Sequence, residues 1–127
     1  MPEVRKAFPE PIGAAETIRR YIDLLVGKLC LELESRGVGA RRLDLVYERV
    51  DGMRKAIRIG TAMPTRDRAR LSRMLRDKVG SMDPGFGIET MALAATLVQP
   101  LAPSQSPSSL VEPGPPDVSD LVDILAN

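Results

Sequence analysis

The sequence predicts an α+β domain in which four antiparallel strands carry two helices on one face. Two runs of alternating apolar and polar residues within 42–59 are separated by Asp51-Gly52, a strong hairpin signal. Segments with helical periodicity flank this hairpin, over 13–36 and 65–79. Strand-like runs at 4–8 and 88–97 complete the order β-α-β-β-α-β, which is the split βαβ arrangement.

The first part of the chain predicts a short strand and a long helix. Pro9 and Pro11 are expected to end the strand 4–8, because proline cannot donate to a strand ladder. Gly37 is the expected left-handed cap of the helix. The apolar stripe of this helix consists of Ile18, Tyr21, Ile22, Leu25, Leu29 and Leu33.

The central hairpin is predicted to have one apolar and one polar face. Its turn is expected at Asp51-Gly52 as a type I′ turn, which needs a positive φ at both residues. The apolar face would hold Leu43, Leu45, Tyr47, Ile57 and Ile59. The opposite face would hold Arg42, Asp44, Val46, Glu48, Arg54, Ala56 and Arg58.

A second helix and a last strand follow the hairpin. Thr65 or Asp67 can cap the helix, which is expected to run to about Val79. The last strand places Met91, Leu93, Ala95 and Leu97 on one face and Thr90, Ala92, Ala94 and Thr96 on the other. We expect Leu45, Ile57, Ile59 and Leu93 to meet the helices. The face with Arg42, Arg54 and Arg58 would stay open.

The composition changes after residue 98. The segment 99–116 holds six of the eleven prolines, which is typical of an extended linker. Residues 117–125 could form a short amphipathic helix that stops abruptly at Asn127, so this end looks like a cut or truncated reading frame. We therefore divide the chain into a folded domain 1–98, a Pro/Ser-rich linker 99–116 and a truncated short helix 117–127.

The charge is distributed unevenly along the chain. All 18 Lys and Arg residues lie between Arg5 and Lys78, so residues 1–80 carry a net charge of +7 and residues 81–127 one of −6. A basic body with an acidic tail is typical of a domain that faces a polyanion. The alternative is a solvated basic helix face and a solubilising tail.

The cysteine and histidine content limits the possible chemistry. One cysteine, Cys30, makes an internal disulfide impossible, and the lack of histidine argues against a zinc site. Cys30 is expected to be a small buried hydrophobic residue. Asp44 and Glu48 lie too far apart on a strand to share a proton or a metal, which argues against an enzyme. No signal peptide or long apolar run is evident, and we expect a cytoplasmic protein without a cofactor.

Several motifs resemble the C-terminal region of the ImuB family, bacterial relatives of Y-family DNA polymerases. The resemblance covers nearly the whole chain. It is carried mainly by 39–52 (GARRLDLVYERVDG), 57–67 (IRIGTAMPTRD) and 83–89 (DPGFGIE), with support from 8–12 and 121–127.

The resemblance implies a little finger domain, the additional DNA-binding module of translesion polymerases. It implies that the exposed sheet face lies in the major groove and that basic side chains grip phosphates. Carried over to this sequence, the DNA contacts would be Arg42, Arg54, Lys55 and Arg58, with Thr61 and Arg66 as weaker candidates. The palm, fingers and thumb of a polymerase are absent from this sequence, so the resemblance implies a non-catalytic accessory domain.

The resemblance also implies protein partners. ImuB-type proteins work in a mutagenic repair complex of the SOS response with ImuA, an error-prone polymerase and the sliding clamp. They tend to carry a clamp-binding peptide beyond the little finger. The nearest match here is Gln105-Ser-Pro-Ser-Ser-Leu110, which lacks the aromatic end and has a long spacing from Gln105 to Leu110.

Two functions from different classes stay open at this point. The first is a DNA-binding module that docks a repair complex onto primer–template DNA, with salt-sensitive and sequence-independent binding. The second is a protein-interaction module in which the sheet face or the tail pairs with another chain. In that case the small-residue strand 88–97 and the apolar residues Leu121, Val122 and Leu125 would bury against the partner, and DNA affinity would be weak. A third, structural alternative is that Arg42, Arg54 and Arg58 pair with acidic residues on neighbouring strands.

Overall fold

The structure, a computed structural model, describes residues 1–102. Its elements are β1 (Glu3–Ile12), α1 (Ala15–Ser35), β2 (Val38–Arg49), β3 (Arg54–Thr65), α2 (Arg68–Arg76), a 3-10 helix η1 (Val79–Ser81) and β4 (Ile88–Pro100). Apart from the short η1, this is the order that the sequence predicts.

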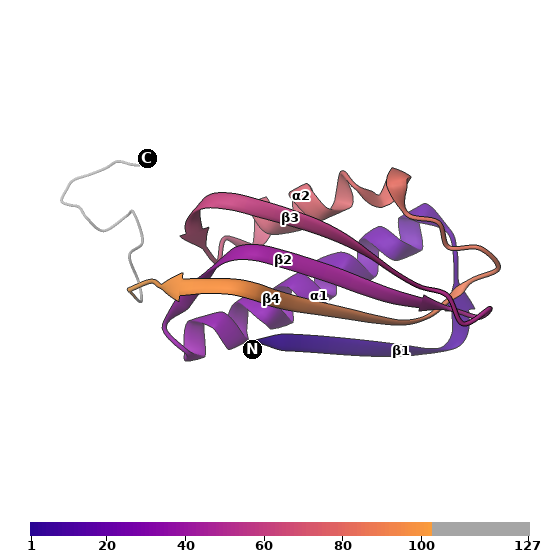
Figure 1. Cartoon of the computed structure of the whole chain (residues 1–127), viewed down its shortest axis with the longest axis horizontal. Helices are drawn as coiled ribbons and strands as arrows, with labels where there is room; N and C mark the ends of the chain where they lie inside the picture. The colour runs from indigo at the N-terminus through magenta and orange to yellow at the C-terminus, as the bar shows by residue number, and fades with distance from the viewer. Residues whose placement is uncertain (103–127) are drawn as a thin grey trace.

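The strands form one antiparallel sheet in the order β1-β4-β2-β3. The hairpin strands β2 and β3 are neighbours, and β4 inserts between β1 and β2. Figure 1 shows both helices on the same side of this sheet. The predicted α+β fold, with four antiparallel strands and two helices on one face, is therefore confirmed.

The core lies between the sheet and the helices and is mainly aliphatic. Leu29 from α1, Leu45 from β2 and Leu93 from β4 are all 0% exposed. Burying one such side chain contributes about 1.5–3 kcal/mol. The predicted inward face is confirmed, since Ile59 is buried and Ile57 packs partly buried against the same core.

The few aromatic residues occupy defined places in this core. Phe8 of β1 packs edge-to-face on Tyr21 of α1, with 4.8 Å between the ring centroids. The Tyr47 ring is buried, and its hydroxyl accepts a 3.0 Å hydrogen bond from the backbone N–H of Asp83. Tyr47 therefore anchors the loop that precedes β4 to the central strand β2.

The turn between β2 and β3 differs from the type I′ turn that the sequence predicts. The Gly52 N–H donates to the Arg49 carbonyl, so Val50 and Asp51 hold the central positions and Gly52 follows them with a φ of 85°. The carboxylate of Asp51 accepts from the Met53 N–H at 3.1 Å. This contact favours a longer turn with one left-handed glycine over a two-residue turn.

The two edge strands are longer than expected. Pro9 and Pro11 lie within β1, although the sequence predicted that they would end this strand. Pro64 likewise lies within β3, which runs to Thr65, beyond the hairpin run 42–59 that the alternation indicated. β1 and β3 each have a neighbour on one side only. Proline is tolerated there because an outward-facing position needs no ladder donor.

A β-bulge changes the end of β4. Arg42 pairs with Leu97, whereas the next residue, Leu43, pairs with Ala95, so Thr96 is the additional residue. A bulge shifts the alternation of side chains by one residue. Leu97 is consequently 42% exposed, and the prediction that it shares the buried face of Met91 and Leu93 is wrong.

The helix ends mostly follow the sequence signals. Gly37 has a φ of 68° after α1, which confirms the predicted left-handed cap. Asp67 caps α2 by accepting from the Arg70 N–H at 3.3 Å, as one of the two predicted candidates. The regular helix α2 ends at Arg76, before the predicted end at about Val79, where η1 begins.

Candidate nucleic-acid interface

The side of the sheet opposite the helices forms a surface that we call the open face. The strand register places its residues in rows across the sheet. One row runs Glu3, Ala94, Asp44, Arg58; the next runs Arg5, Ala92, Val46, Ala56; the third runs Ala7, Thr90, Glu48, Arg54. Arg42 and Thr96 lie beside the first row.

Small side chains make the middle of the open face flat. Ala92 and Ala94 of β4 lie there beside Val46 of β2. A shallow hollow of about 380 Å³ lies over these residues, and Arg5 and Arg54 line it from the two edge strands. Three strand spacings separate β1 from β3, which is about 14 Å. The face is therefore a flat strip with arginines along both edges.

Arg58 is held by an acidic neighbour. Its Nε and a terminal nitrogen donate to the two carboxylate oxygens of Asp44 at 2.6 and 2.9 Å. The hydrogen bond from Arg58 is the main reason that the pKa of Asp44 is lowered, and the same contact raises the pKa of Arg58. The Arg58 side chain is still 61% exposed, whereas that of Asp44 is 15% exposed.

The other two arginines on the open face of the hairpin differ from Arg58. Arg42 is half-buried, and its Nε donates to the Thr96 hydroxyl at 3.0 Å, so it spans the bulge in β4. Arg54 is exposed and lies opposite Glu48 in the register. Among residues 1–102, Arg54 forms no ion pair within 4.0 Å, which leaves its guanidinium available to a ligand.

Two of the predicted contact residues, Lys55 and Thr61, lie away from the open face. Lys55 is opposite the buried Tyr47, so it lies on the helix side of the sheet. The Thr61 hydroxyl lies 2.8 Å from the Met63 carbonyl and 3.2 Å from the Ala40 carbonyl, so its one hydrogen is shared between backbone acceptors at the end of the sheet. These two residues therefore do not join the open face.

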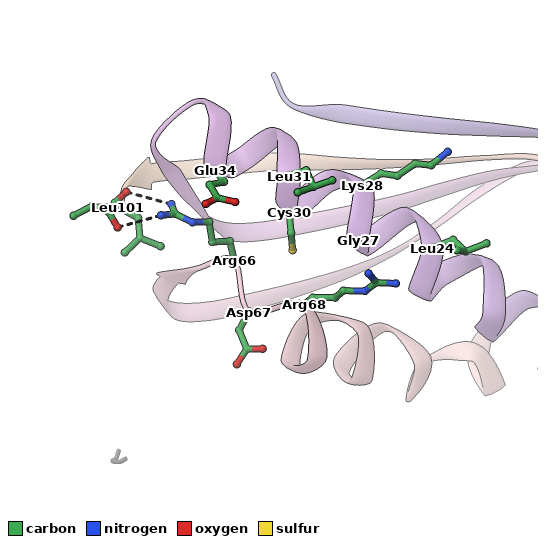
Figure 2. Close-up of a pocket in the computed structure, with 11 residues that line it drawn as sticks. Leu24, Gly27, Lys28, Cys30, Leu31, Glu34, Arg66, Asp67, Arg68 and Leu101 are labelled. Atoms are coloured by element: carbon green, nitrogen blue, oxygen red, sulfur yellow. Dashed lines mark hydrogen bonds between the residues drawn. The ribbon is translucent and has the colours of Figure 1, made fainter. Parts of the chain in front are cut away.

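Arg66 is a structural residue in the described part of the chain. Its guanidinium donates to the carbonyls of Val38, Leu101 and Ala102 at 3.0 to 3.2 Å. These bonds tie the end of β4 to the start of β2, as Figure 2 shows for Leu101. Satisfying three carbonyls leaves little of this side chain for a phosphate.

Arg5 is a candidate that the sequence reasoning missed. It is exposed on β1, where it lies opposite Ala92 on the open face, and its Nε lies 3.4 Å from Glu3. The signal in the sequence was the alternation of Val4, Lys6 and Phe8 with Glu3 and Arg5. We could not use it because the position of β1 in the sheet was unknown.

The open face as a whole is nearly balanced in charge. Its arginines at 5, 42, 54 and 58 lie among the carboxylates of Glu3, Asp44 and Glu48. Many of the remaining cations lie in the helix layer, where Arg68 binds Asp23 at 3.1 Å and Arg76 donates to the Ser72 carbonyl. The exposed Arg70 and Arg73 lie on α2, and the exposed Lys78 lies just after it. These three residues therefore do not extend the open face.

The described residues contain no arrangement typical of a metal site. Within 1–102, no group of three or more His, Cys, Asp or Glu side chains is placed to hold a metal ion. Neither of the two helices there is both long and apolar enough to cross a membrane. The clamp-peptide residues Gln105 and Leu110 lie outside the described residues.

Comparison with known proteins relates this chain to the C-terminal part of polymerase-like proteins. The family model described as the impB/mucB/samB family C-terminal domain matches residues 4–107. Protein ImuB of Caulobacter vibrioides, from strains NA1000 / CB15N and ATCC 19089 / CIP 103742 / CB 15, is 40% identical over 102 residues. These residues are 80% of this chain but 22% of that protein, so the chain spans about a fifth of its relatives' length.

Solved structures with the same fold include a little finger domain. The structure titled as a complex of the beta-clamp processivity factor and the little finger domain of PolIV matches with a TM-score of 0.63 at 19% identity. The match covers 86% of this chain and 98% of that chain. An insertion ternary complex of Dbh DNA polymerase matches with a TM-score of 0.59 at 9% identity, over 80% of this chain and 28% of that chain.

The strand order, the helices on one face and the sequence matches lead to one assignment. The family model spans most of the chain, and the fold agrees with that of the PolIV little finger over nearly its full length. The chain belongs to the impB/mucB/samB family C-terminal domains and has the fold of a Y-family polymerase little finger.

Proposed function

We propose that this domain binds primer–template DNA through the open face, as the non-catalytic accessory domain of a polymerase-like protein in translesion synthesis. The observation that carries the proposal is the flat strip of small residues between Arg5 on β1 and Arg54 and Arg58 on β3. The strip is about 14 Å wide by strand spacing. This is similar to the width of the major groove of B-DNA, about 12 Å, so the arginines at its two edges would lie near the phosphates on either side of the groove.

The chemistry of the edge residues fits phosphate better than bases. Arginine forms bidentate, charge-assisted hydrogen bonds with phosphate oxygens. The middle strands offer Ala92, Ala94 and Val46, which have no groups to read a base edge, and the polar residues beside them in the three rows are limited to Asp44, Glu48 and Thr90. Binding is therefore expected to depend little on sequence, because phosphate contacts carry no base information. The small residues would let the DNA approach the sheet closely.

Substitutions on the two layers of the domain test this proposal. Arg54→Glu reverses an exposed charge on the open face, and Arg73→Glu reverses an exposed charge on α2. Both variants change the net charge equally, so the comparison separates position from total charge. We expect fluorescence anisotropy with labelled primer–template DNA to show that Arg54→Glu weakens binding by about tenfold or more, as lost charge contacts do. Equal losses in both variants would argue against the open face.

The similarity to a little finger solved with a sliding clamp supports a second candidate function. The PolIV little finger is described in complex with the beta-clamp. We propose that this chain also contacts a clamp, through the peptide from Gln105 to Leu110. Replacing both residues by alanine is expected to abolish clamp binding in a surface plasmon resonance assay and to leave DNA binding intact. Unchanged clamp affinity would exclude the peptide.

The wider setting is proposed on the basis of the relationship to ImuB. The parent protein would act in DNA repair and SOS mutagenesis in the bacterial cytoplasm, with an ImuA-like protein and an error-prone polymerase as partners. The chain corresponds to 22% of the curated ImuB proteins. Co-purification of the full-length parent with each partner, with and without its little finger region, tests whether this domain is needed for assembly.

A further inference from the structure

A groove with an apolar side lies in the helix layer, on the side of the domain away from the open face. It has a volume of about 680 Å³ and is lined by residues of α1, by the start of α2 with the two residues before it, and by the two residues that follow β4. Leu24 and Leu31 of α1 line it and are 47% and 68% exposed. Exposed leucines on one side of a groove are typical of a surface that binds another segment.

Polar contacts hold the walls of this groove in place. Arg68 donates to the carbonyl and the carboxylate of Asp23 and so lies across α1. It can do so because residue 27 is glycine, where a Cβ would lie 2.6 Å from the Arg68 guanidinium. Figure 2 shows Cys30 directed from α1 toward the segment that carries Arg66 and Arg68. The groove is therefore already formed in the described structure.

The chain leaves the folded domain at this groove. Leu101 and Ala102 are part of its lining. The Leu101 N–H donates to the Gly37 carbonyl at 2.9 Å, and Arg66 binds the carbonyls of Leu101 and Ala102. Whatever follows Ala102 therefore starts at one end of this groove.

The residues beyond 102 include a segment that complements the groove. Within 117–127, the apolar residues Val118, Leu121, Val122 and Leu125 follow helical spacing, and Asp120 and Asp123 lie between them. The chain has no basic residue after Lys78, so every charged side chain of this segment is acidic. The groove offers Lys28, Arg66 and Arg68 beside Glu34 and Asp67, and Lys28 forms no ion pair within the described residues.

The connecting segment is long enough to allow this contact. Residues 103–116 are rich in proline, and at about 3.1 Å per residue they would span about 40 Å when extended. The distance along α1 from Leu24 to Leu31 is only about 10 Å. A short tether also gives the segment an effective concentration in the millimolar range, so even weak binding would fill the groove.

We propose that residues 117–127 dock into the groove between α1 and the start of α2, with Leu121, Val122 and Leu125 against Leu24 and Leu31. The segment covers the apolar surface of α1, and its aspartates lie near Lys28. This contact leaves the open face free, and it hides a surface that a partner protein could otherwise use.

The single cysteine reports whether the groove is covered. Cys30 lines the groove and is half-buried, and burial raises the pKa of its thiol to about 11. The experiment measures the rate at which a maleimide labels Cys30 in the full chain at constant pH. Leu121→Ser/Leu125→Ser removes two apolar contacts of the segment. Leu110→Ser/Val111→Ser removes the same number of apolar side chains upstream of it and serves as the matched control.

The proposal predicts that the Leu121→Ser/Leu125→Ser variant is labelled about fourfold faster than the wild type and the control. A fourfold difference corresponds to a groove that the segment covers about three quarters of the time. A millimolar effective concentration gives this coverage when the dissociation constant is about a third of that concentration. The rates should not depend on protein concentration. In a Leu31→Ser background, the same tail substitutions should have much less effect, because the contact they remove is already weakened.

Three results would overturn the proposal. Equal labelling rates in all chains would mean that the segment does not cover the groove. Equal acceleration in the tail variant and the control would mean that 117–127 has no special role. Protection that grows with protein concentration would assign the groove to a second copy of the chain. Leu31 is 68% exposed, so its substitution removes no core side chain, and the tail substitutions leave residues 1–102 unchanged.

Discussion

Arg54 and Arg58 lie on the same face of β3 and differ in what they contact. Arg58 forms two hydrogen bonds with Asp44, whereas Arg54 forms no ion pair among residues 1–102. A phosphate must compete with Asp44 for Arg58 but not with any described residue for Arg54. Arg54 and Arg58 therefore differ in how readily they can bind a DNA phosphate, although the alternation along β3 places both on the open face.

The substitution Asp44→Asn tests this difference. It removes a negative charge from the open face and frees Arg58 for a phosphate. We expect DNA affinity to rise about threefold or more at low salt, and the slope of log K against log salt to steepen by about 0.9. Anisotropy titrations at several salt concentrations measure both quantities.

Glu32→Gln is the matched control for Asp44→Asn. Glu32 lies on α1 and pairs with Arg36 at 2.7 Å, so the variant removes one negative charge and frees one arginine in the helix layer. An equal gain in both variants would mean that total charge, and not the open face, determines affinity.

Arg49 is a second arginine whose role is structural. Its side chain is 12% exposed and binds Asp51 in the turn and Asp83 in the loop before β4. The hydrogen bond from Arg49 is the main reason that the pKa of Asp51 falls from 3.8 to about 2. Because the folded state lowers this pKa, the pair stabilises the fold above about pH 4 and loses this effect as the pH falls through 2.

Asp51→Asn isolates this charge effect. Asparagine can still accept the hydrogen bond from the Met53 N–H, so the turn keeps its backbone contact. We expect a lower urea midpoint than the wild type at pH 7, and most of the difference should be lost by pH 2. Asp77→Asn, which removes a carboxylate without an ion pair in the described residues, should show little difference at pH 7. A deficit that persists at pH 2 would contradict the role of charge.

At the scale of elements, the β2–β3 turn depends on one left-handed glycine. Gly52 has a φ of 85°, and no atom lies within 4 Å of the position where its Cβ would be. Alanine there would cost about 1–2 kcal/mol from backbone conformation alone. Gly80→Ala is the control, since that site is equally open and its φ is outside the left-handed region. Urea unfolding should separate the two variants, and equal stability would contradict the observed turn.

The elements show which parts of the fold the sequence could predict. Apolar periodicity predicted α1, the hairpin and the inward face, because each depends on residues close together in the chain. The lengths of β1 and β3 could not be predicted, since Pro9, Pro11 and Pro64 are tolerated only at sheet edges and the strand order was unknown. The bulge at Thr96 depends on pairing with Arg42, more than fifty residues away.

At the scale of the whole molecule, the domain has two surfaces with different properties. The open face is flat and nearly balanced in charge, and the helix layer carries the basic residues of α2 and the groove beside Leu24 and Leu31. The excess of cations in residues 1–80 suggested a domain that faces a polyanion. The structure divides these cations between both layers, which net charge along the sequence could not reveal.

Only part of the candidate site could be predicted, because the sequence shows which residues alternate on a strand but not where each strand lies in the sheet. Alternation placed Arg42, Arg54 and Arg58 on the open face, and the register confirms these positions. Lys55 and Arg66 were chosen by resemblance alone. Lys55 lies on the helix side of the sheet, and the guanidinium of Arg66 donates to backbone carbonyls. Arg5 was missed because β1 joins the sheet by pairing with β4, a strand that lies far from it in the sequence. Whether any of these residues touches DNA stays a prediction.

The measurement that tests the central claim most directly is NMR of alanine methyl groups during titration with primer–template DNA. Ala56 and Ala92 report on the open face, and Ala69 of α2 reports on the helix layer. We predict that DNA shifts the methyl signals of Ala56 and Ala92 and leaves that of Ala69 in place. Shifts confined to Ala69, with Ala56 and Ala92 unchanged at saturation, would contradict binding through the open face.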